Sequence, residues 1–166
     1  GEWLYAKHTV YYDRLPHYFL EFDVLDRQEG VFLSAQRRHA LLQDLPIVSV
    51  PVLAEGVFKR SEELLALLGP SKFISPGKTG DLRLASQKLG LDPDRQCREA
   101  DPSNLMEGLY IKVEEDGQVV DRLKYVRATF TQTVEASQTH WLDRPIVPNG
   151  LAMPLESLFA PTLPGR

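Results

Sequence analysis

The sequence contains a single cysteine, Cys97, and this scarcity excludes whole classes of site. A disulfide framework and a cysteine zinc site both need several cysteines, and a reducing cytoplasm is the expected location. Long apolar runs are missing as well, since none approaches the roughly 20 residues that cross a bilayer. A secretory signal peptide is not visible. We therefore expect a cytoplasmic protein with no membrane partner.

A strong charge of either sign is also lacking, because the formal net charge of the 166 residues is −4. A protein that coats nucleic acid needs a large positive charge, so any site for a polyanion must be a local cluster. The composition, with 43% hydrophobic and 25% charged residues, is that of an ordinary globular domain. The chain opens at Gly1 without methionine, and its first residues already have the pattern of a strand. We expect that an N-terminal portion is missing.

Several common motifs of catalysis and metal binding are absent or incomplete. The four histidines have no metal-ligand spacing, and no serine lies in a Gly-x-Ser-x-Gly elbow. Gly77-Lys78-Thr79 ends like a phosphate-binding loop, but Lys72 stands where that motif needs glycine. These gaps exclude a hydrolase with a serine in a Gly-x-Ser-x-Gly elbow and a nucleoside triphosphatase with a phosphate-binding loop.

The apolar periodicity and the turn residues predict an α+β fold. Strands are expected at 2–12, 18–25, 31–33, 47–53, 107–114 and 119–128. Helices are expected at 34–43, with Ser34 as the N-cap, and at 61–68, 81–89 and 130–137. Residues 56–106 then form a mostly helical insertion. A tail from Pro145, which holds five of the twelve prolines, is expected to wrap the surface irregularly.

Asp116-Gly117 is a strong signal for a two-residue hairpin turn between the strands at 107–114 and 119–128. In that register Leu109 faces Lys124, Glu107 faces Val126, and Glu107 lies diagonal to Lys124 on a largely apolar face. The other face holds Tyr110, Lys112, Tyr125 and Arg127. A bulge would exchange these faces.

A partly buried pair of an acid and an amine adds little stability, so Glu107 and Lys124 indicate a site. Something anionic, together with a metal ion, is the expected ligand. The alternative is a solvated amphipathic hairpin with scattered surface charges.

Four short motifs, taken in order, resemble those of the ATP-dependent RNA ligases. Glu107-Gly-x-x-x-Lys112 is similar to the fourth nucleotidyltransferase motif of that family, and Lys124 to the first lysine of the fifth. Upstream, Gly1-Glu2-Trp3 resembles the third motif, and residues 19–24 resemble the strand that follows it. The stretch 141–149 resembles bacterial members of the group. The order and approximate spacing agree over residues 1–128.

The resemblance implies a nucleotidyltransferase domain of the ATP-grasp-like ligase kind, built from antiparallel sheets and incomplete at its N-terminus, over residues 1–166. It also implies that the protein is an RNA ligase that takes part in RNA repair. In that family a lysine takes AMP from ATP and passes it to a 5′-phosphate end, and a 3′-hydroxyl then displaces the AMP and seals the strand. The implied cofactors are ATP and Mg²⁺, and the implied partners are RNA or nicked nucleic-acid ends.

Matching positions carry the family's residue roles onto this chain. The implied catalytic residues are Glu107, Lys112 and Lys124, and the implied nucleotide-binding residues are Glu2, Phe22, Phe19, Lys112, Lys124 and Arg127. Glu2 binds the ribose, Phe22 stacks on adenine with Phe19 as the second choice, and Glu107 helps to place the metal. This assignment agrees with the chemistry, because phosphoryl transfer needs cations on the developing charge and Mg²⁺ prefers carboxylate and phosphate oxygens.

The sequence departs from the family at two points. None of the seven lysines begins the Lys-x-Asp-Gly motif of the nucleophile, so this chain alone is expected to be inactive. The family's fifth motif has two lysines one residue apart, whereas Val126 stands at the second place and Arg127 follows it. Two alternatives stay open: a non-catalytic module that binds nucleotide or RNA ends, and a capping-type nucleotidyltransferase that uses GTP.

Overall fold

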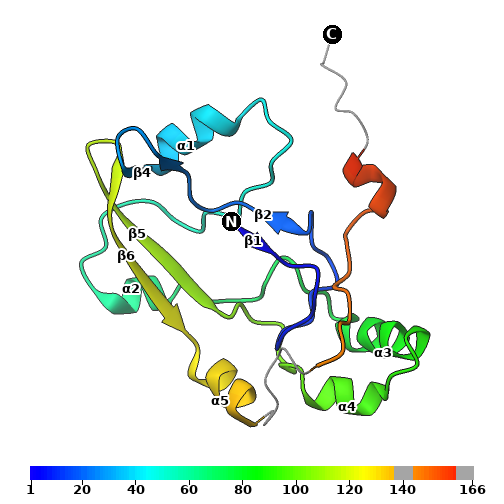
Figure 1. Cartoon of the computed structure of the whole chain (residues 1–166). Coiled ribbons are helices and arrows are strands. Elements are labelled where there is room, and N and C mark those ends of the chain that lie inside the picture. The colour runs from blue at the N-terminus through cyan, green and yellow to red at the C-terminus, as the bar shows by residue number, and fades with distance from the viewer. Residues whose placement is uncertain (137–143, 160–166) are drawn as a thin grey trace.

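The computed structural model describes residues 1–136 and 144–159, and these residues form an α+β structure with two antiparallel sheets (Figure 1). One sheet pairs β1 (Glu2–Trp3) with β2 (Phe19–Leu20). The other has the strand order β3-β4-β6-β5. No helix of the described residues is long and apolar enough to cross a membrane. The predicted α+β class is confirmed.

The larger sheet is dominated by one long hairpin, β5 (Gly108–Glu115) and β6 (Gln118–Val126), which runs diagonally across Figure 1. The short strands β3 (Leu25–Asp26) and β4 (Val31–Leu33) extend it on the β6 side. Asp116 and Gly117 have φ angles of 48° and 78°, the left-handed pair that a two-residue hairpin turn needs. The predicted turn and both strands are therefore confirmed.

The predicted pairing beyond the turn is wrong by one residue. Glu115 faces Gln118 and Glu114 faces Val119, as the two-residue turn requires, but Val113 pairs with Asp121 instead of Val120, so Val120 is an extra residue in β6. This bulge makes Leu109 face Tyr125 instead of Lys124. A one-residue shift moves side chains to the opposite face, which decides the composition of the site described below.

The N-terminal strands are much shorter than predicted. The expected strand at 18–25 is divided between β2 and β3, and between them Glu21 forms a single parallel bridge with Ser49. Residues 47–53 form no strand in the structure. Pro46 precedes the alternating valines and Pro51 interrupts them between Val50 and Val52, and proline cannot donate to a ladder. Two backbone hydrogen bonds remain, from Glu21 N to Val48 O and from Val50 N to Glu21 O, each 2.8 Å long.

The five helices of the described residues lie around the sheets (Figure 1). Their bounds are α1 (Ala35–Leu42), α2 (Ser61–Leu65), α3 (Lys78–Lys88), α4 (Pro93–Arg98) and α5 (Ala128–Ala136). The predicted cap is confirmed, because the Ser34 hydroxyl accepts from the backbone N–H of Arg37. The short helix α4 was not predicted, and α2 is shorter than expected. Ser137, at the end of the predicted last helix, lies outside the described residues.

The C-terminal tail is irregular, as predicted, but it does not stay on the surface. Val147 is fully buried and Asn149 is only 3% exposed. The backbone of Val147 and Asn149 bonds to that of Lys7 and Tyr5, so the segment around Ala6 pairs with the tail through an isolated antiparallel bridge. Val147 also joins a core cluster with Tyr11, Leu82 and Ala100, so the two ends of the chain and the α3–α4 helices share one core. A 3-10 helix, η2 (Leu155–Phe159), follows.

Candidate functional site

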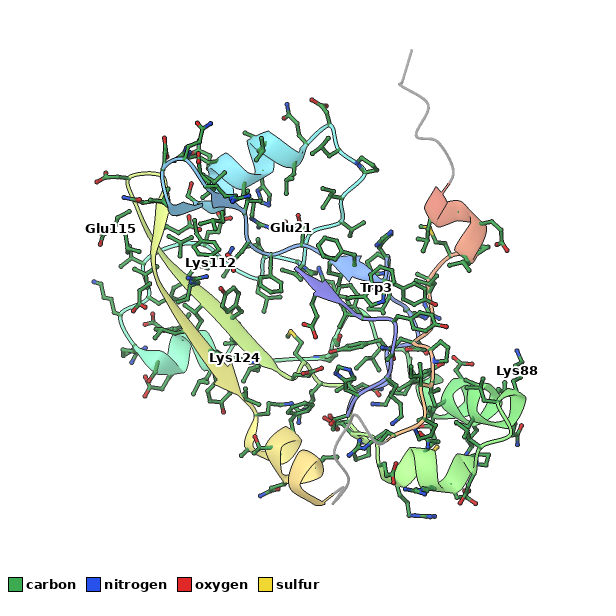
Figure 2. The ribbon with its side chains drawn as sticks, in the orientation of Figure 1. Trp3, Glu21, Lys88, Lys112, Glu115 and Lys124 are labelled. Carbon is green, nitrogen blue, oxygen red and sulfur yellow. The ribbon has the colours of Figure 1, made fainter. Side chains whose placement is uncertain are left out.

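The bulge in β6 gathers basic side chains on one face of the hairpin. Lys112 lies directly opposite Arg122, and Tyr110 lies opposite Lys124, so all four side chains share a face. We call this surface the lysine face. The unbulged register placed Lys112 and Lys124 on opposite faces, and the structure corrects that prediction. Figure 2 shows Lys112 and Lys124 on the two strands, with Lys112 on the side of Glu21.

Asp23 is the acidic centre of the lysine face. Its carboxylate lies 2.9 Å from Lys112 Nζ and 3.8 Å from the guanidinium of Arg122, and it accepts a 2.7 Å hydrogen bond from the Tyr110 hydroxyl. The side chains of Asp23 and Lys112 are only 9% and 14% exposed, so this pair is screened poorly by water. The surplus of positive charge on this face suits an anionic ligand.

Sequence reasoning gave Asp23 only the role of a residue at a strand end. The signal that could have found it is its place directly after Phe22, in the short segment between β2 and β3. Lys112 also donates to the backbone carbonyl of Phe22, so its ammonium is fixed by two adjacent residues of that segment. Burial and the hydrogen bond to Asp23 raise the pKa of the Tyr110 hydroxyl, which therefore stays protonated as a donor at neutral pH.

Of the two candidate phenylalanines, Phe22 contacts the lysine face. Its half-buried ring meets the ring of Tyr110 edge-on, with 5.5 Å between the centroids. Phe19 lies instead in β2, opposite Trp3, and its ring packs against Gly1. The choice of Phe22 over Phe19 fits this arrangement.

Glu107 directly precedes β5. Its carboxylate accepts a hydrogen bond from the hydroxyl of Tyr12, a residue that the sequence analysis did not identify. Burial raises the pKa of Glu107. The negative charges of Glu2 and Asp101 act in the same direction, whereas the Tyr12 hydrogen bond and the positive charge of Lys124 oppose it. The Tyr12 pKa is raised in turn, mainly by its own burial and by Glu107.

The predicted ion pair between Glu107 and Lys124 is not formed. Within the described residues no carboxylate lies within 4 Å of the Lys124 ammonium, and Lys124 is exposed on its strand. The two groups are close enough for their charges to interact, but the bulge has moved Lys124 to the face shared with Tyr110. Lys124 is thus a cation of the lysine face that remains free for a ligand.

The remaining predicted residues occupy different settings. Glu2 is exposed in β1, and its charge acts on both Glu107 and Tyr12. Arg127 is buried, and its guanidinium pairs with Asp101 at 2.5 Å and donates to Met106 O and the Thr129 hydroxyl. Arg127 therefore binds other groups of the protein and is not part of the lysine face. The part of the 141–149 resemblance before Arg144 lies outside the described residues.

The described residues contain no cluster of three or more histidine, cysteine or acidic side chains that could hold a metal by itself. A metal at this site would have to take most of its ligands from a bound phosphate chain and from water, which is the usual state of Mg²⁺ with a nucleotide. The Glu107 carboxylate, with one oxygen bonded to Tyr12, fits the part of a single protein ligand.

Comparison with known proteins gives a family. The model of the family described as RNA ligase matches residues 1–126, which include β1 to β6 and every residue of the lysine face. No curated protein matches the chain, and no solved structure does. The match covers well over half of the 166 residues and carries Glu2, Phe22, Glu107, Lys112 and Lys124 within it. The chain belongs to the RNA ligase family.

Proposed function

We propose that these residues form the nucleotide-binding part of an ATP-dependent RNA ligase that joins 5′-phosphate and 3′-hydroxyl ends. The observation that carries the proposal is the lysine face, where the bulge at Val120 places Lys112 and Lys124 on the same face of two paired strands, diagonal to one another. Membership of the RNA ligase family supports the reaction class. The nucleotidyltransferase fold of the ATP-grasp-like kind is part of this proposal.

The roles follow from the position of each group. Phe22 lies next to the lysine face and offers its ring to adenine, and Glu2 offers an exposed carboxylate to the ribose hydroxyls. Lys124, which has no carboxylate partner among the described residues, contacts the phosphates directly. Lys112 is held by Asp23 at 2.9 Å, so it presents a fixed charge at low entropic cost.

Glu107 would hold Mg²⁺, which supplies charge neutralisation to the phosphates when it is bound. Burial raises the pKa of Glu107, and a cation bound to its carboxylate would lower that pKa. Tyr12 fixes the orientation of this carboxylate through its hydrogen bond.

The covalent step needs a lysine nucleophile, and no lysine of this sequence begins Lys-x-Asp-Gly. We therefore place the nucleophile outside these 166 residues. The lysine attacks the α-phosphorus of ATP and pyrophosphate leaves; the 5′-phosphate of one RNA end then displaces the lysine; the 3′-hydroxyl of the other end finally displaces AMP. The lysine face stabilises the negative charge that develops on the phosphates in each step.

Equilibrium binding tests the nucleotide site without the nucleophile. We expect the chain to bind ATP with Mg²⁺, and Lys124→Ala to weaken ATP binding about tenfold while AMP binding, which lacks the outer phosphates, changes less. Lys88→Ala, a control on an exposed lysine at the end of α3, should bind like the wild type. A chain that binds GTP in preference to ATP, or Lys124→Ala and Lys88→Ala binding equally well, would contradict the proposal.

Labelled ATP tests the reaction itself. The protein expressed from its natural gene should become covalently labelled and should seal a 5′-phosphate end to a 3′-hydroxyl end, and Glu107→Ala should abolish sealing. A protein that binds ATP but never becomes labelled would be a binding module and not a ligase.

A further inference from the structure

A cleft of about 340 Å³ lies in the α3–α4 region, on the opposite side of the molecule from the hairpin turn (Figure 1). This volume lies at the lower end of the range of small-molecule sites, about 300–1,000 Å³. Leu82, Ala100 and Pro102 give it an apolar wall, and Lys78, Arg83 and Arg98 bring basic groups to it. An apolar wall beside cations suits a ligand with both a flat organic part and a phosphate.

Lys78 is the built-in cation of the cleft. It is only 5% exposed, and its ammonium donates to the backbone carbonyls of Asp101 (2.9 Å) and Ser103. An ammonium has three donors, so these two bonds leave one donor for a ligand in the cleft. The positive charge itself is not neutralised by these carbonyls, because they are neutral dipoles.

The charges around Lys78 are unevenly compensated. Arg83 pairs with Asp94 at 2.7 Å, and the Asp101 carboxylate pairs with Arg127 at 2.5 Å. Arg98, exposed at the end of α4, has no carboxylate partner among residues 1–136 and 144–159. Asp94 and Asp101 also line the cleft, but each forms an ion pair with an arginine, Arg83 or Arg127. Lys78 and Arg98 form no ion pair with a carboxylate among the described residues, although the charge of Asp101 acts on Lys78.

Tyr11 supplies an unused donor. Its side chain is only 4% exposed and lines the cleft, yet its hydroxyl makes no hydrogen bond within the part of the chain that the structure describes. The hydroxyl is not among the fully enclosed polar atoms that lack a partner, and Tyr11 is a lining residue of the cleft. Burial and the charges of Asp81 and Asp13 raise the pKa of Tyr11 to about 12, which keeps the hydroxyl protonated.

Asp101 connects this cleft to the carboxylate at the other site. Its backbone N–H donates to Thr9 O, its carbonyl accepts from Lys78, and its carboxylate accepts from Arg127, which follows β6 directly. Its negative charge contributes to the raised pKa of Glu107. Asp101 thus belongs both to the wall of the cleft and to the surroundings of Glu107.

We propose that the α3–α4 cleft binds one nucleotide of single-stranded RNA, with a backbone phosphate on Lys78 and Arg98 and the base against the apolar wall. The Tyr11 hydroxyl donates to the phosphate or the ribose. This inference rests on the proposed function for the identity of the polymer, and it gives the helical segment a substrate-binding role that is separate from ATP binding.

The test measures binding of a fluorescently labelled single-stranded oligoribonucleotide to the chain by anisotropy, at several KCl concentrations. Arg98→Glu should weaken RNA binding about tenfold or more at low salt and lower the slope of log Kd against log salt by about one, because one phosphate contact is lost. Tyr11→Phe removes only the hydroxyl and should weaken binding by roughly three- to tenfold. Neither variant should change ATP binding.

Lys88→Glu is the matched control, since it makes an equal change of charge on α3 at a point far from the hairpin and outside the cleft lining (Figure 2). Equal losses in Arg98→Glu and Lys88→Glu would show general surface electrostatics and overturn the inference. Unchanged RNA binding in Arg98→Glu would also overturn it. Failure of the wild type to bind ATP, with RNA binding still dependent on Arg98, would instead refute the proposed function and leave the cleft assignment standing.

Discussion

Lys7 is the residue whose charge the folded protein accommodates least well. Its side chain is 6% exposed and its ammonium makes one long hydrogen bond, 3.3 Å, to the carbonyl of His8. Burial, followed by the positive charge of Arg144, lowers the pKa of Lys7 from 10.5 to about 8. At neutral pH the lysine is charged in both the folded and the unfolded state, and the folded state carries the cost of burying it.

We predict that Lys7→Met raises the free energy of unfolding at pH 7 by on the order of 3 kcal/mol, from the size of the pKa shift. The advantage should shrink between about pH 8 and 10.5. In that window the folded wild type has released the proton that the unfolded chain still binds, so its stability rises with pH. Urea unfolding at pH 7 and at pH 10.5 measures both values, and the exposed Lys88→Met serves as the control. A wild type more stable than Lys7→Met at pH 7 would contradict the burial argument.

The two phenylalanines offer a matched pair for the adenine site. Phe22→Leu should weaken ATP binding about tenfold, because the loss of one stacking surface is worth roughly 1–3 kcal/mol, while the melting temperature changes little. Phe19→Leu, which alters a ring on β2 away from the lysine face, should leave ATP binding unchanged. Calorimetric titration with ATP separates the two. A collapse of stability in Phe22→Leu without a specific loss of affinity would make Phe22 a core residue.

At the scale of elements, α1 is joined to the strand segment before Phe22 by one buried ion pair. Arg38 of α1 is 2% exposed and its guanidinium lies 2.5 Å from the Glu21 carboxylate, which also accepts from the Ser49 hydroxyl at 2.8 Å. The contacts of the Glu21 carboxylate therefore hold together three parts of the chain: α1, residues 48–50 and the backbone that precedes Phe22 and Asp23.

We predict that Arg38→Ala lowers the free energy of unfolding by about 3–5 kcal/mol, because it leaves Glu21 buried without its counter-charge. The adjacent Arg37→Ala is the control: Arg37 pairs with Glu29 at 3.3 Å, but both side chains are largely exposed, and such pairs contribute about 0–1 kcal/mol. Chemical denaturation of the two variants gives the comparison. Similar losses in both would mean that the buried pair does not anchor α1.

The hairpin shows which features of an element can be predicted from sequence. The Asp116-Gly117 turn was predictable because few residue pairs accept two positive φ angles. The bulge was not, because Val119 and Val120 have the same strand propensity, and nothing in the sequence shows that Val119 pairs with Glu114 whereas Val120 is left without a partner in β5. Local propensity does not distinguish them; the packing of β4, where Phe32 pairs with Val119 and stacks under Arg122, does. The sequence therefore predicted the turn and both strands but gave Lys124 the wrong neighbours on the hairpin.

At the scale of the whole molecule, the same limit explains the other differences. The residues expected at the site, such as Glu107 and Lys112, follow from motifs of a few positions. Tyr12, which bonds Glu107, lies 95 residues away, and Asp23 lies 89 residues from Lys112. Such partners depend on how distant segments meet. The proline-rich tail gave no periodic signal at all, although Val147 is among the most buried residues.

That tail sets the last prediction, because Asn149 ties the end of the described chain to its beginning. Its side-chain carbonyl accepts from Tyr12 N at 2.9 Å, its amide donates to Leu4 O at 2.9 Å, and its own carbonyl accepts from the Tyr18 hydroxyl. Removing the side chain leaves a buried N–H and a buried carbonyl without partners, each worth about 1–3 kcal/mol.

Asn149→Ala should therefore lower the free energy of unfolding by about 3 kcal/mol and the melting temperature by roughly 10 °C. Because Tyr12 orients Glu107, it should also weaken Mg²⁺-dependent ATP binding below the melting temperature. Asn104→Ala is the control, since its side chain makes no hydrogen bond within the described residues. Scanning calorimetry and ATP titration measure the two effects. Equal melting temperatures of the two variants would contradict this prediction. They would show that the N-terminal segment does not need the tail to hold it, and neither do Tyr12 and the Glu107 carboxylate.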